Sequence, residues 1–204
     1  MLENLQELKS QVESCRKCEL CQTRTNIVFG VGSPETEVLF VGEGPGKNED
    51  EQGEPFVGRS GQLLDKMLEY IGLSRKHNIY IANIVKCRPP ENRDPSQAES
   101  EACIGYLRNQ VRIIKPKIIV CLGRVAATRI ISPDFKVTKE HGRFIERSGV
   151  LLMGTFHPAA LLRNPNQKPA AMQDFLTLKA KIAEVCSPEF QEQIQKFEEE
   201  LNSI

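Results

Sequence analysis

The chain has 204 residues, which suits one domain with a real hydrophobic core. Its 27 basic and 27 acidic residues cancel, so a nucleic-acid partner would have to meet a local basic face rather than a positive field over the whole protein. The sequence lacks both a membrane-length apolar run and the apolar centre of a signal peptide, so we expect a soluble, cytoplasmic monomer with no membrane partner.

The first part of the chain predicts two helices and a strand. Residues 2–14 carry apolar side chains at helical spacing and lead into a cysteine-rich turn. Residues 38–41 form a short apolar run that predicts a buried strand, and a polar stretch rich in glycine and proline follows over residues 42–61. A second helix is predicted over residues 62–71, where apolar positions repeat with the period of a helix before Gly72.

Strands and helices continue to alternate over the rest of the chain, which predicts an α/β fold. The predicted strands cover residues 79–82, 118–122 and 150–154, and the predicted helices cover about 97–114, 123–131 and 170–186. Such alternation favours three α/β/α layers around a central, mostly parallel, four-stranded sheet. We expect one domain over residues 1–186, followed by a charged helical extension over residues 187–204.

Three loops at the predicted carboxyl ends of strands carry unusual residues. Ligands bind beyond these ends in a parallel sheet, so the loops after Val41, Ala82 and Gly154 are candidate binding segments. The glycine-rich loop 42–46 lacks the Lys-Ser/Thr pair of a Walker loop and the spacing of a dinucleotide fingerprint. An ordinary strand-to-helix turn would explain its glycines, but not the carboxylates, phenylalanine and arginine crowded behind them.

The other two loops supply an amide and an imidazole. The side-chain amide of Asn83 can donate and accept, as reading the edge of a nucleobase requires, although a turn cap would use it equally well. His157 follows the last strand, and a His-Pro pair alone is commonplace. A histidine, an asparagine, a carboxylate and an aromatic ring at the ends of different strands together favour a base-binding site.

The seven cysteines favour a metal centre over disulfides, because the cytosol is reducing and an odd number leaves one cysteine unpaired. Cys15 and Cys18 form a C-x2-C pair, Cys87 follows a predicted strand, and Cys103 lies in the next helix. Cys21 competes for a ligand position, since it extends the pair to a ferredoxin-like spacing. Four thiolates fit zinc and an iron–sulfur cluster equally well, and a role without metal is a third alternative.

Four motifs carry a resemblance to a known family. In chain order they read GEGPGKNED (42–50), GEPFVG (53–58), NIVKCRPP (83–90) and HPAALLR (157–163). With suitable gaps between them, they resemble the family 4 branch of the uracil-DNA glycosylase superfamily, over about residues 15–181. The combination of the four motifs is highly specific.

The resemblance implies a [4Fe-4S] cluster as cofactor. The cysteine ligands of the family fall on Cys15, Cys18, Cys87 and Cys103. Cys21 occupies a position that the family does not use. Because Cys87 lies within the third motif, four residues after Asn83, such a cluster would brace the loop that reads the base.

The resemblance also implies roles for the loop residues. Phe56 would stack on a uracil flipped out of DNA, and Asn83 would read its edge. His157 would donate a hydrogen bond to the base oxygen on which negative charge develops. Glu49 resembles the residue that narrows the pocket against the methyl group of thymine.

The remaining implied residues concern water and the DNA strand. Better-known members of the superfamily have an aspartate where this chain has Gly44, so we expect the neighbouring Glu43 to orient the water. Gly42 and Gly44 would line the substrate site. Leu161 would fill the space left in the duplex, and Arg163 would contact a nearby phosphate.

These implications predict a monofunctional glycosylase that removes uracil from single- or double-stranded DNA and leaves an abasic site for base excision repair. No histidine lies between Asn83 and Cys103, so we do not expect the covalent adduct of a related branch. His141 lies in a predicted hairpin over residues 136–143, which would touch DNA or form a plain surface turn. The alternative function is a non-catalytic accessory module of replication that binds DNA and holds zinc or an iron–sulfur cluster.

Overall fold

A computed structural model describes residues 4–203 and shows one sheet of six strands, in the order β1-β3-β2-β4-β6-β5. The four central strands run parallel, whereas β1 and β5 pair antiparallel with β3 and β6. The strands are β1 (Val31–Gly32), β2 (Val38–Gly42), β3 (Tyr80–Asn83), β4 (Ile118–Leu122), β5 (Phe144–Arg147) and β6 (Val150–Thr155). The sheet is therefore mixed and six-stranded, and the predicted four-stranded parallel sheet is only its centre.

The two edge strands lack the apolar runs from which the central strands were predicted. Strand β1 has only two residues, and β5 is exposed beyond the half-buried Phe144. The strands β2, β3 and β4 are instead buried along their whole length, as a sheet covered on both faces requires. The hairpin predicted over residues 136–143 is wrong, because helix α7 (Val137–Glu140) and a turn occupy that stretch and the hairpin is formed by β5 and β6.

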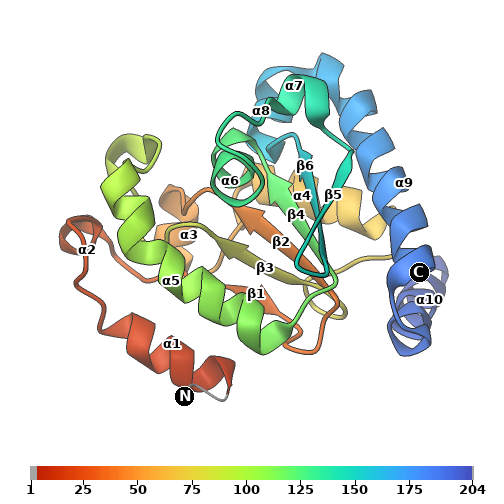
Figure 1. Cartoon of the computed structure of the whole chain (residues 1–204), viewed down its shortest axis with the longest axis horizontal. Helices are drawn as coiled ribbons and strands as arrows, with labels where there is room; N and C mark the ends of the chain where they lie inside the picture. Colours follow the sequence, from red (N-terminus) through yellow and green to blue (C-terminus); the bar gives the residue numbers. More distant parts are fainter. Residues whose placement is uncertain (1–3, 204) are drawn as a thin grey trace.

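Helices connect the strands and cover both faces of the sheet (Figure 1). The other helices are α1 (Leu5–Glu13), α2 (Leu20–Thr23), α3 (Lys47–Gln52), α4 (Arg59–Glu69), α5 (Gln97–Ile114), α6 (Arg124–Ile130), α8 (Pro158–Arg163), α9 (Lys168–Val185) and α10 (Pro188–Asn202), with short 3-10 turns at Pro90–Asn92 and Pro165–Gln167. The predicted bounds of α5 are confirmed, and Ser96 and Glu99 form the capping box that fixes its start. Residues 2 and 3 of the predicted first helix lie outside the described residues.

Two apolar cores lie on opposite faces of the sheet. Along β2, Phe40 belongs to the core shared with α4, α8, α9 and α10, whereas Leu39 and Val41 belong to the core shared with α1, α5 and α6. Figure 1 shows α9 and α10 on one side of the sheet and α1 with α5 on the other. Helix α10 buries Phe190 and Ile194, so this charged terminal helix packs on the same domain.

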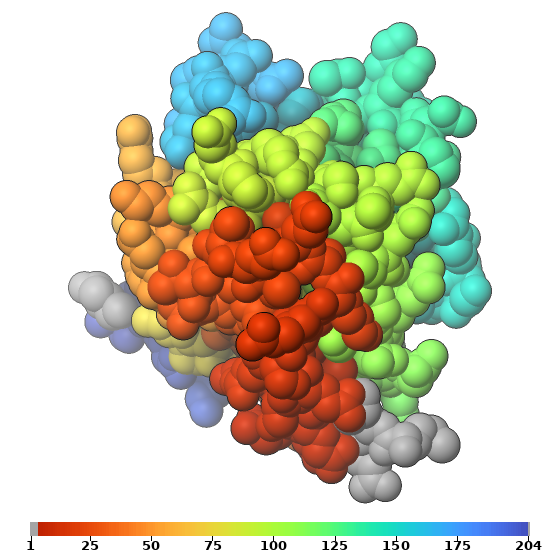
Figure 2. Space-filling view, turned by 90° about the vertical axis from the view of Figure 1, so that its left-hand side faces the viewer, coloured from red at the N-terminus to blue at the C-terminus, as the bar shows by residue number. Residues whose placement is uncertain are grey.

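The N-terminal segment packs against α5. Helix α1 buries Leu8 and Val12 in the core that α5 shares. Figure 2 shows the N-terminal residues lying against the residues near position 100. This packing places the cysteine-rich turn after α1 beside α5. Across residues 4–203, no helix is long and apolar enough to span a membrane.

Candidate active site

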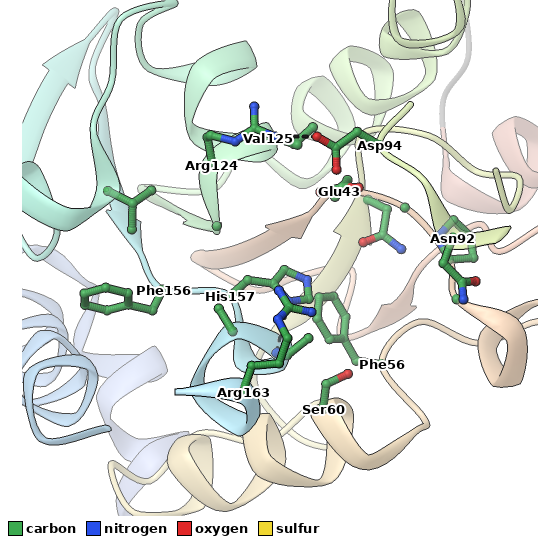
Figure 3. Close-up of a pocket in the computed structure, with 18 of the residues that line it drawn as sticks. Glu43, Phe56, Ser60, Asn92, Asp94, Arg124, Val125, Phe156, His157 and Arg163 are labelled. Atoms are coloured by element: carbon green, nitrogen blue, oxygen red, sulfur yellow. Dashed lines mark hydrogen bonds and ion pairs between the residues drawn. The ribbon is translucent and has the colours of Figure 1, made fainter. Parts of the chain in front are cut away.

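A pocket of about 580 Å³ opens where the loops that follow the parallel strands meet. Most of the predicted site residues line it, namely Glu43, Gly44, Glu49, Phe56, Asn83, His157 and Arg163. Figure 3 shows the rings of His157 and Phe56 close together in this pocket, with Glu43 and Asp94 across from them. The structure therefore brings together side chains that lie more than a hundred positions apart in the sequence.

Asn83 ends β3 and presents an unsatisfied acceptor to the pocket. Its side-chain Oδ1 is buried and has no hydrogen-bond partner within the described residues. Leaving such an acceptor unpaired costs about 1–3 kcal/mol, a cost that a donor on a ligand would remove. Gly42 makes room for this arrangement, because a Cβ at its position would overlap both Asn83 Oδ1 and the ring of Phe56.

Phe56 forms a flat apolar wall next to this amide. Its backbone is left-handed, with a φ of 55°, which is uncommon for a residue other than glycine. The Glu49 carboxylate supports the turn by accepting from the amides of Val57 and Gly58, both at 3.0 Å. The Phe56 ring then lies 5.6 Å from the His157 ring, with the two planes tilted by 32°.

His157 is held as a neutral ring with one orientation. It is the N-cap of α8, and its Nδ1 accepts a hydrogen bond of 3.1 Å from the Ala159 amide. The pKa of His157 is lowered to about 4, mainly by burial and also by the charge of Arg163, while the charge of Glu49 opposes the shift. With Nδ1 engaged as an acceptor, the proton of the neutral imidazole resides on Nε2, which can donate.

Glu43 lies in the pocket with a carboxyl group of unusual basicity. Its pKa is raised to about 7, mainly by burial and also by the charge of the neighbouring Asp94 and a hydrogen bond with it. Arg124 and Arg163 act in the opposite direction. A carboxyl group with this pKa can hold or release a proton near neutral pH.

Asp94 and Arg124 are site residues that the sequence reasoning missed. Both line the pocket, and they form an ion pair across its mouth. Asp94 follows the proline-rich loop after β3, and Arg124 begins the helix after β4. Both residues follow the end of a strand, which made them candidates for the site. Their separation along the chain did not show that the two loops meet.

The predicted DNA contact of Leu161 needs correction. The side chain of Leu161 is completely buried in the core shared by α8 and α9, so as placed it cannot reach into a duplex. Helix α8 is short and amphipathic, and its next residue, Leu162, is the partly exposed one. Arg163 is exposed at the pocket mouth, where its predicted contact with a phosphate stays a prediction.

The cysteine cavity is a second, much smaller cavity on the α5 side of the sheet. Five cysteines line it, namely Cys15, Cys18, Cys21, Cys87 and Cys103. The side chain of Arg24 donates to Cys87 Sγ at 3.3 Å, and the backbone amide of Lys86 donates to Cys103 Sγ at 3.3 Å. The predicted ligands and the competing Cys21 thus gather around one space, although they come from three segments of the chain.

The thiols of the cysteine cavity are not arranged around a single ion. Among residues 4–203, no three His, Cys, Asp or Glu side chains stand close enough to hold one metal ion between them. Burial is the main cause that raises the pKa of Cys18, Cys103 and Cys87, the last to about 11. As thiolates these groups would need positive charge beside them, which Arg24 and a bound metal centre could supply.

Comparison with known proteins places this geometry in a family. Residues 29–181 match the sequence profile of the Uracil DNA glycosylase superfamily. A type-4 uracil-DNA glycosylase of Sulfurisphaera tokodaii is 45% identical over 187 residues, which cover 87% of this chain and 84% of that protein. The chain belongs to the type-4 uracil-DNA glycosylases.

Other type-4 uracil-DNA glycosylases support the same assignment. The enzyme of Archaeoglobus fulgidus is 45% identical over 193 residues, which cover 91% of this chain and 94% of that protein. The enzyme of Saccharolobus solfataricus is 40% identical over 191 residues, which cover 89% of this chain and 88% of that protein. The resemblance seen in the four motifs is therefore confirmed, and it extends well beyond them.

Proposed function

We propose that the protein is a monofunctional glycosylase that hydrolyses the N-glycosidic bond of deoxyuridine in DNA and leaves an abasic site. One observation carries the proposal: Asn83, whose buried Oδ1 has no hydrogen-bond partner among residues 4–203, lines a pocket together with Phe56 and a neutral His157. This site offers a planar wall, an amide that can accept and donate, and a neutral donor. A pyrimidine base can use all three.

Recognition would begin when uracil leaves the base stack and enters the pocket, at a cost that is lowest for unpaired or mismatched uracil. Its ring would stack on Phe56, and Asn83 Oδ1 would accept from the N3–H of the base. The Nδ2 group of the same amide would donate to O4 of uracil. Cytosine lacks the N3–H and has an amino group in place of O4, so it would leave both atoms of the amide badly paired.

His157 would stabilise the departing base. When the bond between C1′ and N1 breaks, the electron pair goes to uracil and negative charge spreads onto O2. The Nε2–H of the neutral His157 is available to donate to that oxygen, because Nδ1 is engaged by the Ala159 amide. A fixed donor aimed at developing charge is worth about 3–4 kcal/mol in comparable sites.

Glu43 would complete the hydrolysis. The deoxyribose carbon becomes positively charged as the base leaves, and a water oxygen bonds to C1′. The Glu43 carboxylate orients this water and accepts its proton, and uracil leaves as an anion that solvent then protonates. Since Glu43 has a pKa of about 7, the carboxylate form needed here becomes populated as the pH rises through that value.

The cysteine cavity fits a [4Fe-4S] cluster held by Cys15, Cys18, Cys87 and Cys103. One observation supports this fit: the thiols come from three segments of the chain and line one cavity. The cluster would supply a covalent brace between the N-terminal turn, the loop after β3 and α5.

The DNA substrate would lie across the pocket mouth. Arg163 and Arg124 are exposed cations there, although Arg124 is paired with Asp94. A phosphate on either side of the flipped nucleotide would give these guanidinium groups a stronger partner. We propose uracil-containing DNA, single- or double-stranded, as the substrate of a cytoplasmic monomer.

The test of this function is a direct assay. The purified protein is incubated with an oligonucleotide that carries one uracil, and alkaline cleavage then reveals abasic sites. We expect cleavage at the uracil position only, and none with thymine at that position. DNA binding without abasic product, over a range of salt and temperature, would contradict the proposal and favour a non-catalytic accessory module of replication.

A further inference from the structure

Arg75 is a buried cation that takes no part in the steps proposed above. It lies between α4 and β3, and its side chain is only 9% exposed. A guanidinium group is kept out of water only where its donors find acceptors. The acceptors of Arg75 lie in the loop that carries Phe56 and in the helix that follows it.

Arg75 holds two successive carbonyl groups of the Phe56 loop. Its Nη1 donates to the Pro55 carbonyl, and its Nη2 donates to the Phe56 carbonyl at 2.8 Å. On the other side of the fork, Nε donates to Asp65 Oδ1 at 2.9 Å, which fixes the plane of the guanidinium. A planar fork can engage two carbonyls and a carboxylate together, whereas the single ammonium of lysine cannot.

The same turn is held from its other end by a group of opposite charge. Glu49 Oε1 accepts from the amides of Val57 and Gly58, both at 3.0 Å. Gly61 lets α4 approach the Phe56 carbonyl, which a Cβ at that position would overlap. A cation therefore holds the carbonyls of the turn, and an anion holds its amides.

This double support explains the backbone of Phe56. A left-handed conformation at a residue other than glycine persists only where the surrounding structure enforces it. If the turn relaxed to a negative φ, the Phe56 ring would leave its place beside Gly42 and His157. The place of the stacking wall thus depends on the groups that hold the turn.

We propose that Arg75 is a positioning residue, which acts through the Phe56 carbonyl to hold the Phe56 ring against the uracil base. The inference rests on the proposed function, because it assigns to Phe56 the stacking role given above. Arg75 does not line the pocket, so it would affect the reaction only through Phe56.

A double-mutant cycle tests this coupling. The variants R75K, F56A and R75K/F56A are compared with the parent protein in kcat/KM on a uracil oligonucleotide and in inhibition by free uracil. We expect R75K to lower kcat/KM by about tenfold or more and to weaken inhibition by uracil, as displacement of a binding surface does. In the F56A background, R75K should have almost no further effect.

Arg147, whose side chain is exposed, offers a control that is matched to Arg75 in its hydrogen bonds. Its guanidinium also donates to two successive carbonyls, those of Ile130 and Ile131, but it lies on β5 outside the pocket. R147K should leave kcat/KM and inhibition by uracil unchanged. An equal loss in R75K and R147K would show a general effect on stability, and equal effects of R75K in both Phe56 backgrounds would show that Arg75 does not act through Phe56. Either result overturns the inference.

A measurement that does not need activity separates this inference from the proposed function. Amide hydrogen exchange over residues 55–61 should become faster in R75K and stay unchanged in R147K. If exchange becomes faster in R75K while the parent protein releases no uracil, the proposed function is refuted, but Arg75 is still shown to stabilise the turn. Unchanged exchange in R75K would refute that hold, whatever the enzyme does.

Discussion

The active-site pocket and the cysteine cavity are joined by one short stretch of chain, yet they are built in opposite ways. The pocket is wide and leaves the Asn83 acceptor without a partner among residues 4–203, whereas the cysteine cavity is small and two of its thiols, those of Cys87 and Cys103, accept hydrogen bonds from Arg24 and Lys86. An open site with an unsatisfied group is suited to a ligand that comes and goes. A small site whose buried thiols already accept hydrogen bonds is suited to a permanent brace.

Lys86 links the two regions. Its side chain is almost completely buried, and Nζ donates to the Asn83 carbonyl at 3.0 Å and to Gln110 Oε1 at 2.6 Å. The backbone amide of the same residue donates to Cys103 Sγ. The difference between the regions therefore predicts that changes in the pocket lower the rate directly, and that changes in the cysteine cavity act first on stability.

The largest effect is expected from the donor in the pocket. H157A should lower kcat by about 100- to 1,000-fold, because it removes the hydrogen bond that we propose to the departing base. Its iron content and melting temperature should stay close to those of the parent. H77A serves as the control, since His77 stacks on Phe197 of α10 and lies outside the pocket. Unchanged turnover in H157A would remove the assigned role of His157.

A smaller loss of activity is expected when a methyl group is added at Gly42. G42A adds a Cβ that would overlap Asn83 Oδ1 and the Phe56 ring, so kcat/KM should fall by about 10- to 100-fold. G105A is the matched control, because a Cβ on Gly105 of α5 would meet no atom within 4 Å. If both variants were equally active, the close approach at Gly42 would have no part in recognition.

Substitutions in the cysteine cavity should lower stability first and activity second. C103S should abolish the absorbance at roughly 400 nm that marks an iron–sulfur protein and should lower the melting temperature, with a secondary loss of activity. C21S should keep the absorbance and the melting temperature, because Cys21 is not in the proposed ligand set. Bleaching by C21S but not by C103S would show that the ligand set is wrong, and a colourless protein that contains zinc would rule out the cluster.

The smallest effect concerns pH. Below its pKa of about 7 Glu43 is protonated and cannot accept a proton from water, so kcat/KM should rise as the pH rises through that value. D94N removes the negative charge that helps to raise this pKa, so the rise should move to lower pH. A pH profile that is the same in the parent and D94N would contradict the coupling between these two carboxyl groups.

Much of the fold could be predicted because its central strands and longest helices carry strong periodic signals. The bounds of α5 follow from its apolar pattern and the capping box at Ser96, and β4 is an unbroken apolar run. The edge strands β1 and β5 could not be predicted, since one is too short and the other is mostly exposed. Pairing with a neighbour, rather than local sequence, creates such strands.

The site was predictable as a set of residues, but not as a set of contacts. Asn83 and His157 stand out because they follow strand ends, and the pocket does unite them. The sequence could not show that Leu161 faces the core. Helix α8 has only 6 residues and carries two adjacent leucines, so either of them could be the buried one. Asp94 and Arg124 form an ion pair between two loops, and their separation in the sequence does not reveal this contact.

Helix α10 also decides when the chain can finish folding during synthesis. The core on the α5 face is assembled from residues up to Leu152, whereas the opposite core waits for Phe190 and Ile194. A chain released from the ribosome only as far as Cys186 would have a complete cysteine face, whereas its other apolar core would lack the helix that covers its end. Such a nascent chain would be a substrate for chaperones and proteases until its last helix emerged.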